Sequence, residues 1–263
     1  MNPTIDPDLA VTLRRLKLGQ VLTTLPGRLA LAKTNKLSHA EFLQIVLADE
    51  ISRRDSSSAT LRAKAAGLDP TMMFDRWDPT ASVTYDRKLV DELASLRFVE
   101  NSNNAIIMGP VGVGKTFIAT ALGHTAIRRR HSVHFERADR LLKRLRVARL
   151  DNSHDTEIRK LLRVQVLIID DFALATVDAQ DTAVVYEIIV ERHQRATTII
   201  TSNREPNNPH RFGRRCARCG LTVTGSTVLV VDRGDRGRLG RRGSRGARWR
   251  PCRALRQRAS DRD

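Results

Sequence analysis

The sequence predicts an α/β fold with a parallel sheet, preceded by a small helical domain, and three observations predict it. Short runs of β-branched and apolar residues alternate with helical segments between residues 80 and 205, as in parallel sheets that are covered by helices. A glycine-rich loop follows the first of these runs and precedes a helix. Leucines near the amino terminus instead recur at the 3.6-residue period of an amphipathic helix.

Residues 1–67 are expected to form the helical domain, which would bind DNA or a partner protein. The segment "SHAEFLQIVLADEISRR" begins with Ser38 and Glu41, whose side chains can each satisfy a backbone N–H of the other residue in a capping box. We expect "RRDSSSAT" to break this helix and a short helix to follow as far as Gly67. Six cations of the domain could contact DNA phosphates or form a solvated surface, namely Arg14, Arg15, Lys17, Arg28, Lys33 and Lys36.

Residues 68–84 are expected to link this domain to the α/β core. The linker carries Phe74 and Trp77, two of only 11 aromatic residues in the chain. These rings could pack beside a nucleotide base, but the sequence favours their use as apolar anchors of the linker. The core, residues 85–206, is expected to form strands at "NAIIMG", "SVHFERA", "VQVLIIDD" and "TTIITSN" and a helix at "KTFIATALGHTAIRR".

The glycine-rich loop fits the pattern G-x-x-x-x-G-K-[ST] without a mismatch. Its small residues allow the backbone to wrap around phosphates with successive N–H groups pointing inward, and the helix after it presents its positive end to the anion. Lys115 would reach the β and γ phosphates, and the Thr116 hydroxyl would bind Mg²⁺. A chance glycine turn is the alternative, but the position between a strand and a helix favours an ATP site. The predicted ATP-binding residues are Gly109, Pro110, Val111, Gly112, Val113, Gly114, Lys115 and Thr116.

Acidic and amide side chains end two further predicted strands. Asp170 is expected to hold Mg²⁺ through its water shell, beside Thr116. Asp171 would orient or activate the attacking water. The amide of Asn203 can bridge the γ phosphate and that water, although an amide at a strand end is also typical of a simple turn. Asp171 and Asn203 are therefore the predicted catalytic residues.

The segment "ADRLLKRLRVARL" is predicted to be a helix with two different faces. Leu141, Leu145 and Ala148 form an apolar face, which would pack on the core. The opposite face would either be solvated or contact DNA phosphates, and the sequence leaves both alternatives open. That face carries Arg137, Arg140 and Arg144.

The composition argues against a membrane-spanning or secreted protein. No run approaches the roughly 18 uncharged apolar residues of a membrane span, and the amino terminus lacks a secretion signal. The first 206 residues contain no cysteine, so we expect a cytoplasmic protein with no membrane association. From residue 207 on, the chain has 16 Arg, no Lys and four Asp, and this part carries +12 of the net charge of +17. Such an excess usually indicates a polyanionic partner.

Together these segments resemble the IstB/DnaC-type AAA+ ATPases, the ATP-binding helpers of insertion-sequence transposases. The resemblance covers about residues 8–206 and rests on "LKLGQVLTTLPGRL", "LSHAEFLQIVLADEISRR", "GPVGVGKT", "VLIIDDFAL" and "TSNREP". It implies an AAA+ P-loop NTPase that uses ATP and Mg²⁺ to assemble with copies of itself on double-stranded DNA, and that delivers this DNA to a cognate transposase. It also implies that Asp170 and Asp171 are the acidic pair and that Asn203 is the first sensor. Two alternatives are a DnaC-like helicase loader and a non-catalytic ATP- and DNA-binding protein.

The resemblance ends after Pro206. Family members continue with a helix, an Asp-Arg-Leu-type segment that supplies a trans-acting arginine, and a last strand, and we find no such segment in residues 207–263. Cys216 and Cys219 resemble half of a zinc site without its second pair of ligands. Other interpretations are an arginine–glycine nucleic-acid segment, with "TVLVV" as an edge strand, and a translation out of frame, which the missing Lys, Glu and Ile favour. We therefore expect a disordered tail, a sheet without its final elements, and ATP binding with weak turnover.

Overall fold

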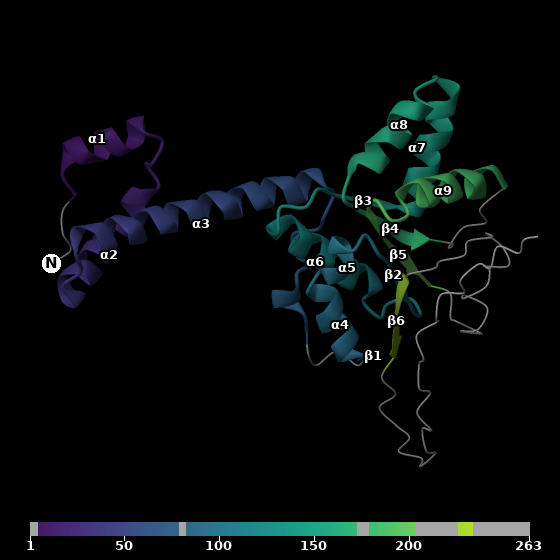
Figure 1. The fold of residues 1–263 in the computed structure, drawn as a ribbon, viewed down its shortest axis with the longest axis horizontal. Coiled ribbons are helices and arrows are strands. Elements are labelled where there is room, and N and C mark those ends of the chain that lie inside the picture. Colours follow the sequence, from purple (N-terminus) through teal and green to yellow (C-terminus); the bar gives the residue numbers. More distant parts are fainter. Residues whose placement is uncertain (1–4, 79–82, 173–178, 204–225, 234–263) are drawn as a thin grey trace, which may run out of the picture.

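The fold is that of a computed structural model, which describes residues 5–78, 83–172, 179–203 and 226–233. Three helices at the amino terminus form an arm, and Figure 1 shows α1, α2 and the first half of α3 standing apart from the sheet. Val21, Leu25 and Val46 form the small core of this arm. The helices of the arm are α1 (Pro7–Arg15), α2 (Val21–Asn35) and α3 (His39–Ala65).

Helix α3 begins at the predicted capping box but does not break where we expected. Ser38 Oγ accepts from the Glu41 N–H, and the Glu41 carboxylate accepts from the Ser38 N–H, so the box is confirmed. The helix then runs for 27 residues, through "RRDSSSAT" and on to Ala65, so the expected break is wrong. Serines weaken a helix only slightly, and tertiary packing overrides this preference. The last part of α3 lies against α6, where Ala63 is buried in the main core.

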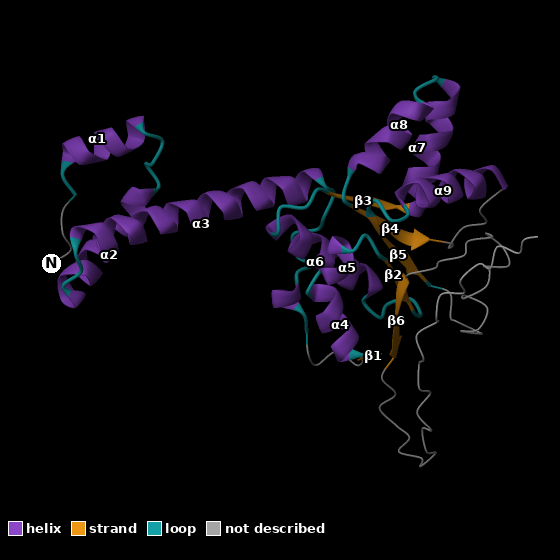
Figure 2. Ribbon diagram, in the orientation of Figure 1, coloured by secondary structure: helices purple, strands orange, loops and turns teal. Residues whose placement is uncertain are grey.

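A six-stranded sheet forms the centre of the molecule (Figure 2). Its strand order is β1-β6-β2-β5-β4-β3, in which the five strands from β6 to β3 are parallel and β1 is antiparallel to β6. The α/β fold with a parallel sheet behind a helical segment is therefore confirmed. The strands are β1 (Val83–Tyr85), β2 (Asn104–Met108), β3 (Val133–Arg137), β4 (Val166–Phe172), β5 (Thr197–Ser202) and β6 (Ser226–Arg233).

The four strands predicted from β-branched runs are all present, as β2, β3, β4 and β5, and the predicted helix after the glycine loop is α6 (Lys115–Arg128). Strand β4 shows why a buried parallel strand can have an unbroken apolar run. Val166 and Ile168 pack into one core, whereas Leu167 and Ile169 pack into another on the opposite face of the sheet. Because successive side chains point to opposite faces and both faces are covered, all four of these positions are apolar.

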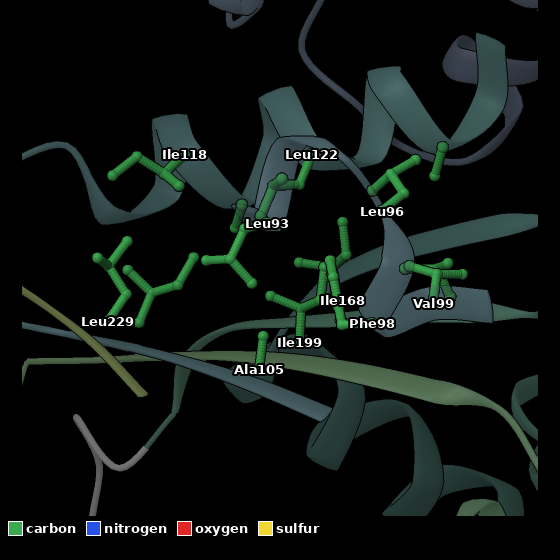
Figure 3. Close-up of a cluster of buried hydrophobic side chains, with 14 of the residues drawn as sticks. Leu93, Leu96, Phe98, Val99, Ala105, Ile118, Leu122, Ile168, Ile199 and Leu229 are labelled. Carbon is green, nitrogen blue, oxygen red and sulfur yellow. The ribbon is translucent and has the colours of Figure 1, made fainter. Parts of the chain in front are cut away.

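Helices cover the two faces of the sheet in separate groups. Figure 3 shows the core on the α6 side, in which Leu122 and Leu93 lie over Ile168 and Ile199. Helices α4 (Arg87–Ala94), α5 (Arg97–Glu100) and α6 contribute to this core. Helices α7 (Ala138–Leu150), α8 (His154–Arg163) and α9 (Ala179–Arg192) contribute to the second core.

Strand β6 corrects the expectation that the sheet lacks its last strand. Residues 226–233 lie between β2 and β1, in an interior position of the sheet, so they are not the edge strand that we considered. Leu229 and Val231 are fully buried in the main core. The run "STVLVVDR" is rich in β-branched residues, which favour strands. The rest of the predicted tail, 207–225 and 234–263, lies outside the described residues.

Candidate functional site

The glycine loop lies at the carboxyl end of β2, directly before α6. Gly112 and Gly114 have φ of +87° and +89°, a conformation that side chains disfavour. At Gly109 an added Cβ would lie 2.0 Å from the carbonyl oxygen of Val231 in β6. The loop is therefore packed closely against β6, the last strand, which helps to position it.

Lys115 is the first residue of α6 and is 5% exposed. Its ammonium group donates to the backbone oxygen of Pro110 at 2.7 Å, so the side chain turns back over the loop. Burial lowers the pKa of Lys115, and the negative charges of Asp171 and Asp170 partly oppose this effect. A phosphate group at the loop would bring a further negative charge to this ammonium.

Asp170 and Thr116 lie in direct contact at the end of β4. The Thr116 hydroxyl donates to the two carboxylate oxygens of Asp170, at 2.9 and 3.1 Å, and Asp170 is 3% exposed. The pair offers oxygen atoms only. Mg²⁺ prefers such ligands, and it is usually held by one or two carboxylates together with substrate phosphates and water. The donor set at this position therefore fits Mg²⁺ bound with a nucleotide.

Asp171 and Asn203 face each other across β4 and β5. The amide nitrogen of Asn203 donates to Asp171 Oδ1 at 3.2 Å. Asp171 has a φ of +55°, in the left-handed region that only a few per cent of non-glycine residues adopt. The structure thus brings the glycine loop, Lys115, the acidic pair and Asn203 together at the carboxyl ends of β2, β4 and β5.

Comparison with known proteins identifies the family of this chain. The family of IstB-like ATP-binding proteins matches residues 11–211. The chain belongs to this family. An insertion-sequence ATP-binding protein of Mycobacterium tuberculosis is 40% identical over 204 residues, which cover 77% of this chain and 81% of the relative. The IS21 ATP-binding protein of Pseudomonas aeruginosa is 34% identical over 197 residues, which cover 75% of this chain and 74% of the relative. Both relatives are named as ATP-binding proteins of insertion sequences.

Solved structures agree with the fold of this IstB-like chain. Domain III of the replication initiation protein DnaA from Thermotoga maritima superposes with a TM-score of 0.51 and 18% identity, over 63% of this chain and 68% of that one. A DnaA bound to AMPPCP and single-stranded DNA gives a TM-score of 0.50 and 18% identity, over 62% of this chain and 50% of that one. These similarities show the fold, and they agree with the AAA+ fold that the family resemblance implies.

One residue of the IstB-like site, Thr201, was not predicted from the sequence. The hydroxyl of Thr201, in β5, donates to Asp170 Oδ1 at 2.6 Å and accepts from the Asp171 N–H at 2.8 Å. Trp77 lies edge-on to Phe117, with ring centroids 5.1 Å apart, and its ring is 3.7 Å from the place of a Cβ at Gly114. Trp77 and Phe74 also pack on the main core, as expected of anchors of the linker. The sequence contains no signal for the contacts of Thr201, because they depend on how β4 and β5 pair in the sheet.

Helix α7 has the two faces that the sequence predicted, but one of its arginines is engaged internally. Leu141, Leu145 and Ala148 are buried. Arg144 forms ion pairs with Glu136 and Glu157, so it stabilises the packing of β3, α7 and α8. Burial raises the pKa of Glu136, but hydrogen bonds from His134 and Arg144 outweigh it and lower the pKa to about 2. Arg137 pairs with Asp139, and Arg140 is exposed.

Two further observations concern the part of the chain that the structure describes. None of its helices combines the length and the apolar character needed to cross a membrane. Within the same ranges, no group of three His, Cys, Asp or Glu side chains is placed to hold a metal ion. Cys216 and Cys219, the residues of the considered zinc site, lie outside the described residues.

Proposed function

We propose that this chain is an ATP-dependent DNA-binding helper of an insertion-sequence transposase. It would assemble with copies of itself on double-stranded target DNA of any sequence, in the cytoplasm, and regulate transposition through its cognate transposase. The proposal rests on the site, in which the glycine loop, the acidic pair and Asn203 lie together. It is supported by relatives that are named as ATP-binding proteins of insertion sequences. We assign DNA or partner binding to residues 1–67, the linker to 68–84, and the ATP-binding core to 85–206 together with β6.

The roles of the site residues follow from their positions. The N–H groups of the loop and the ammonium of Lys115 would hold the phosphates of ATP. Thr116 and Asp170 would hold Mg²⁺, which supplies charge neutralisation at the β and γ phosphates when it is bound. Asp171 and Asn203 would orient the attacking water, because their side chains already meet at the carboxyl ends of β4 and β5. Positioning and charge compensation are the main requirements of phosphoryl transfer.

Turnover by this chain is proposed to be slow. An arginine offered by a neighbouring subunit can raise the rate of phosphoryl transfer by about 10³- to 10⁵-fold in related enzymes. The sequence after Pro206 has no Asp-Arg-Leu-type segment that would supply such an arginine. We therefore propose that ATP binding, more than rapid hydrolysis, controls the state of this protein on DNA.

Exposed cations on the arm offer a surface for DNA phosphates. Arg14, Arg15 and Lys17 are exposed and have no acidic partner among the described residues. Arg28 instead forms a two-point pair with Asp49, so its charge is compensated within the arm. Lysine and arginine contacts with phosphate release counterions and are insensitive to base sequence.

Replacing Arg14, Arg15 and Lys17 together with Ala should weaken binding to duplexes of unrelated sequence to a similar extent. Each lost phosphate contact should reduce the slope of log affinity against log salt by about 0.9. Fluorescence anisotropy of labelled duplexes across a salt series measures both effects, in the presence of ATP. The full chain is used, because truncation after residue 206 would remove β6 from the sheet.

A control triple variant removes the same charge from another part of the surface, through Ala at Arg87, Lys88 and Arg97, which are exposed on α4 and α5. This variant should keep the wild-type salt slope. An equal loss of slope in both variants would show that binding depends only on net charge. An unchanged slope in the first variant would remove the arm from the proposed DNA surface.

A further inference from the structure

The acidic pair lies in an irregularity of the sheet. In the pairing of β4 with β5, Ile169 is opposite Ile200, but Phe172 is opposite Ser202. Two residues of β4, Asp170 and Asp171, therefore face a single residue of β5, which is Thr201. This is a β-bulge, a feature that re-aims side chains and is frequent beside active sites.

The bulge explains how two successive acids can serve one site. In a regular strand, neighbouring side chains point to opposite faces of the sheet. Here Asp170 reaches Thr116 at the start of α6, and Asp171 reaches Asn203 at the end of β5. The change of direction occurs at Asp171, whose backbone has a φ of +55°. A conformation of this kind has a cost and persists only where the surrounding contacts hold it.

The hydroxyl of Thr201 provides such contacts on both sides of the bulge. Thr201 is fully buried. Its oxygen accepts from the Asp171 N–H at 2.8 Å, and its proton is donated to Asp170 Oδ1 at 2.6 Å. One hydroxyl group thus binds the backbone of one acid and the carboxylate of the other.

We propose that Thr201 is a positioning residue, whose hydroxyl holds the bulge and so directs both carboxylates to the nucleotide site. This inference deepens the proposed function and rests on it for its consequence in ATP binding and hydrolysis. Thr201 touches neither the nucleotide nor the water in this account. Its effect passes through Asp170, which would hold Mg²⁺, and through Asp171, which would orient the water.

Strand β5 contains a matched control. Thr197 is also fully buried, at the other end of the same strand, and its hydroxyl has no hydrogen-bond partner among the described residues. Thr→Val keeps the branched shape and removes only the hydroxyl function at either position. If any Thr→Val change in β5 disturbed the site, both variants would show the effect. If the hydroxyl of Thr201 has the proposed role, only Thr201→Val would show it.

The first measurement is made without nucleotide, and it tests the bulge itself. Hydrogen exchange of the Asp171 N–H, followed by NMR, should become about tenfold faster in Thr201→Val, because one hydrogen bond is lost from a protected site. Thr201→Ser keeps the hydroxyl and should restore protection to within about threefold of the wild type. Thr197→Val should leave this exchange rate unchanged.

The second measurement follows the consequence for the site. In titrations of a fluorescent ATP analogue, Thr201→Val should require about 5- to 10-fold more Mg²⁺ for half-maximal binding, since Asp170 keeps its contact with Thr116 but loses the one with Thr201. Its single-turnover hydrolysis should fall about 10- to 100-fold, whereas Thr201→Ser and Thr197→Val should stay within about threefold of the wild type. If Thr201→Val does not fold, Thr201→Ala and Thr201→Ser, which differ only in the hydroxyl group, provide the same comparison.

Equal behaviour of Thr201→Val and Thr197→Val in both measurements would overturn the inference. A wild-type chain that binds no ATP would instead contradict the proposed function. In that case the exchange measurement, which needs no nucleotide, still decides whether Thr201 holds the bulge.

Discussion

Lys115→Ala is expected to raise the dissociation constant for ATP by at least about 100-fold, because charge-assisted hydrogen bonds to phosphate are lost and each 1.4 kcal/mol corresponds to a factor of ten. The ammonium group is held over the loop by the Pro110 carbonyl, 2.7 Å away, so it is already placed for an incoming phosphate. Burial lowers the pKa of Lys115, which means that the folded chain disfavours this charge when no anion is present. The variant should therefore fold normally while it loses ATP.

Titration with a fluorescent ATP analogue measures this effect, and thermal unfolding without nucleotide checks the fold. Lys143→Ala, which changes an exposed lysine of α7, is the matched control and should bind ATP as the wild type does. An affinity of Lys115→Ala within about threefold of the wild type would show that the phosphates bind elsewhere.

Asp171→Asn should separate ATP binding from hydrolysis. The substitution preserves size, and asparagine tolerates the left-handed backbone conformation that Asp171 adopts. An amide oxygen can also accept the hydrogen bond from Asn203. Thr116 and Asp170 remain in place, so the affinity for ATP with Mg²⁺ should stay within about threefold. Hydrolysis should fall at least about 100-fold, because an amide cannot activate or orient water as a carboxylate does.

A single-turnover assay, with protein in excess over radiolabelled ATP, detects hydrolysis even when steady-state turnover is slow. Asp155→Asn, which alters an acid that is 86% exposed, is the control and should hydrolyse ATP at the wild-type rate. Wild-type hydrolysis by Asp171→Asn would remove this residue from the reaction. Loss of ATP binding in the same variant would instead make Asp171 part of the binding site.

Features that depend on neighbours in the sequence were predicted correctly. The capping box at Ser38 requires only a residue three positions away, and both of its hydrogen bonds are present. Residues 105–108 of β2 and 166–169 of β4 are all apolar because both sheet faces are covered, and these runs alone identify the two strands. The glycine loop was predicted correctly between a strand and a helix, because its turn residues follow an apolar run and precede a helical pattern.

Features that depend on distant segments were predicted wrongly or were missed. Helix α3 continues through its serines because its second half packs on α6, where Arg62 donates to the carbonyl of Ile127, 65 residues away in the chain. Strand β6 enters the sheet between β2 and β1, although composition suggested a tail without folded elements. The contacts of Thr201 depend on a shift in register between two strands, and no single segment encodes that shift.

ATP-dependent DNA binding is tested most directly by the affinity of the full chain for double-stranded DNA, measured by anisotropy with ATP and Mg²⁺, with ADP and without nucleotide. We predict that ATP raises the affinity for unrelated duplexes at least about tenfold, because ATP would bind the DNA-bound form of the protein more tightly than the free form. Lys115→Ala should abolish this gain and keep the affinity seen without nucleotide. An affinity for DNA that is the same with and without ATP would contradict the claim that this protein is an ATP-dependent DNA-binding helper.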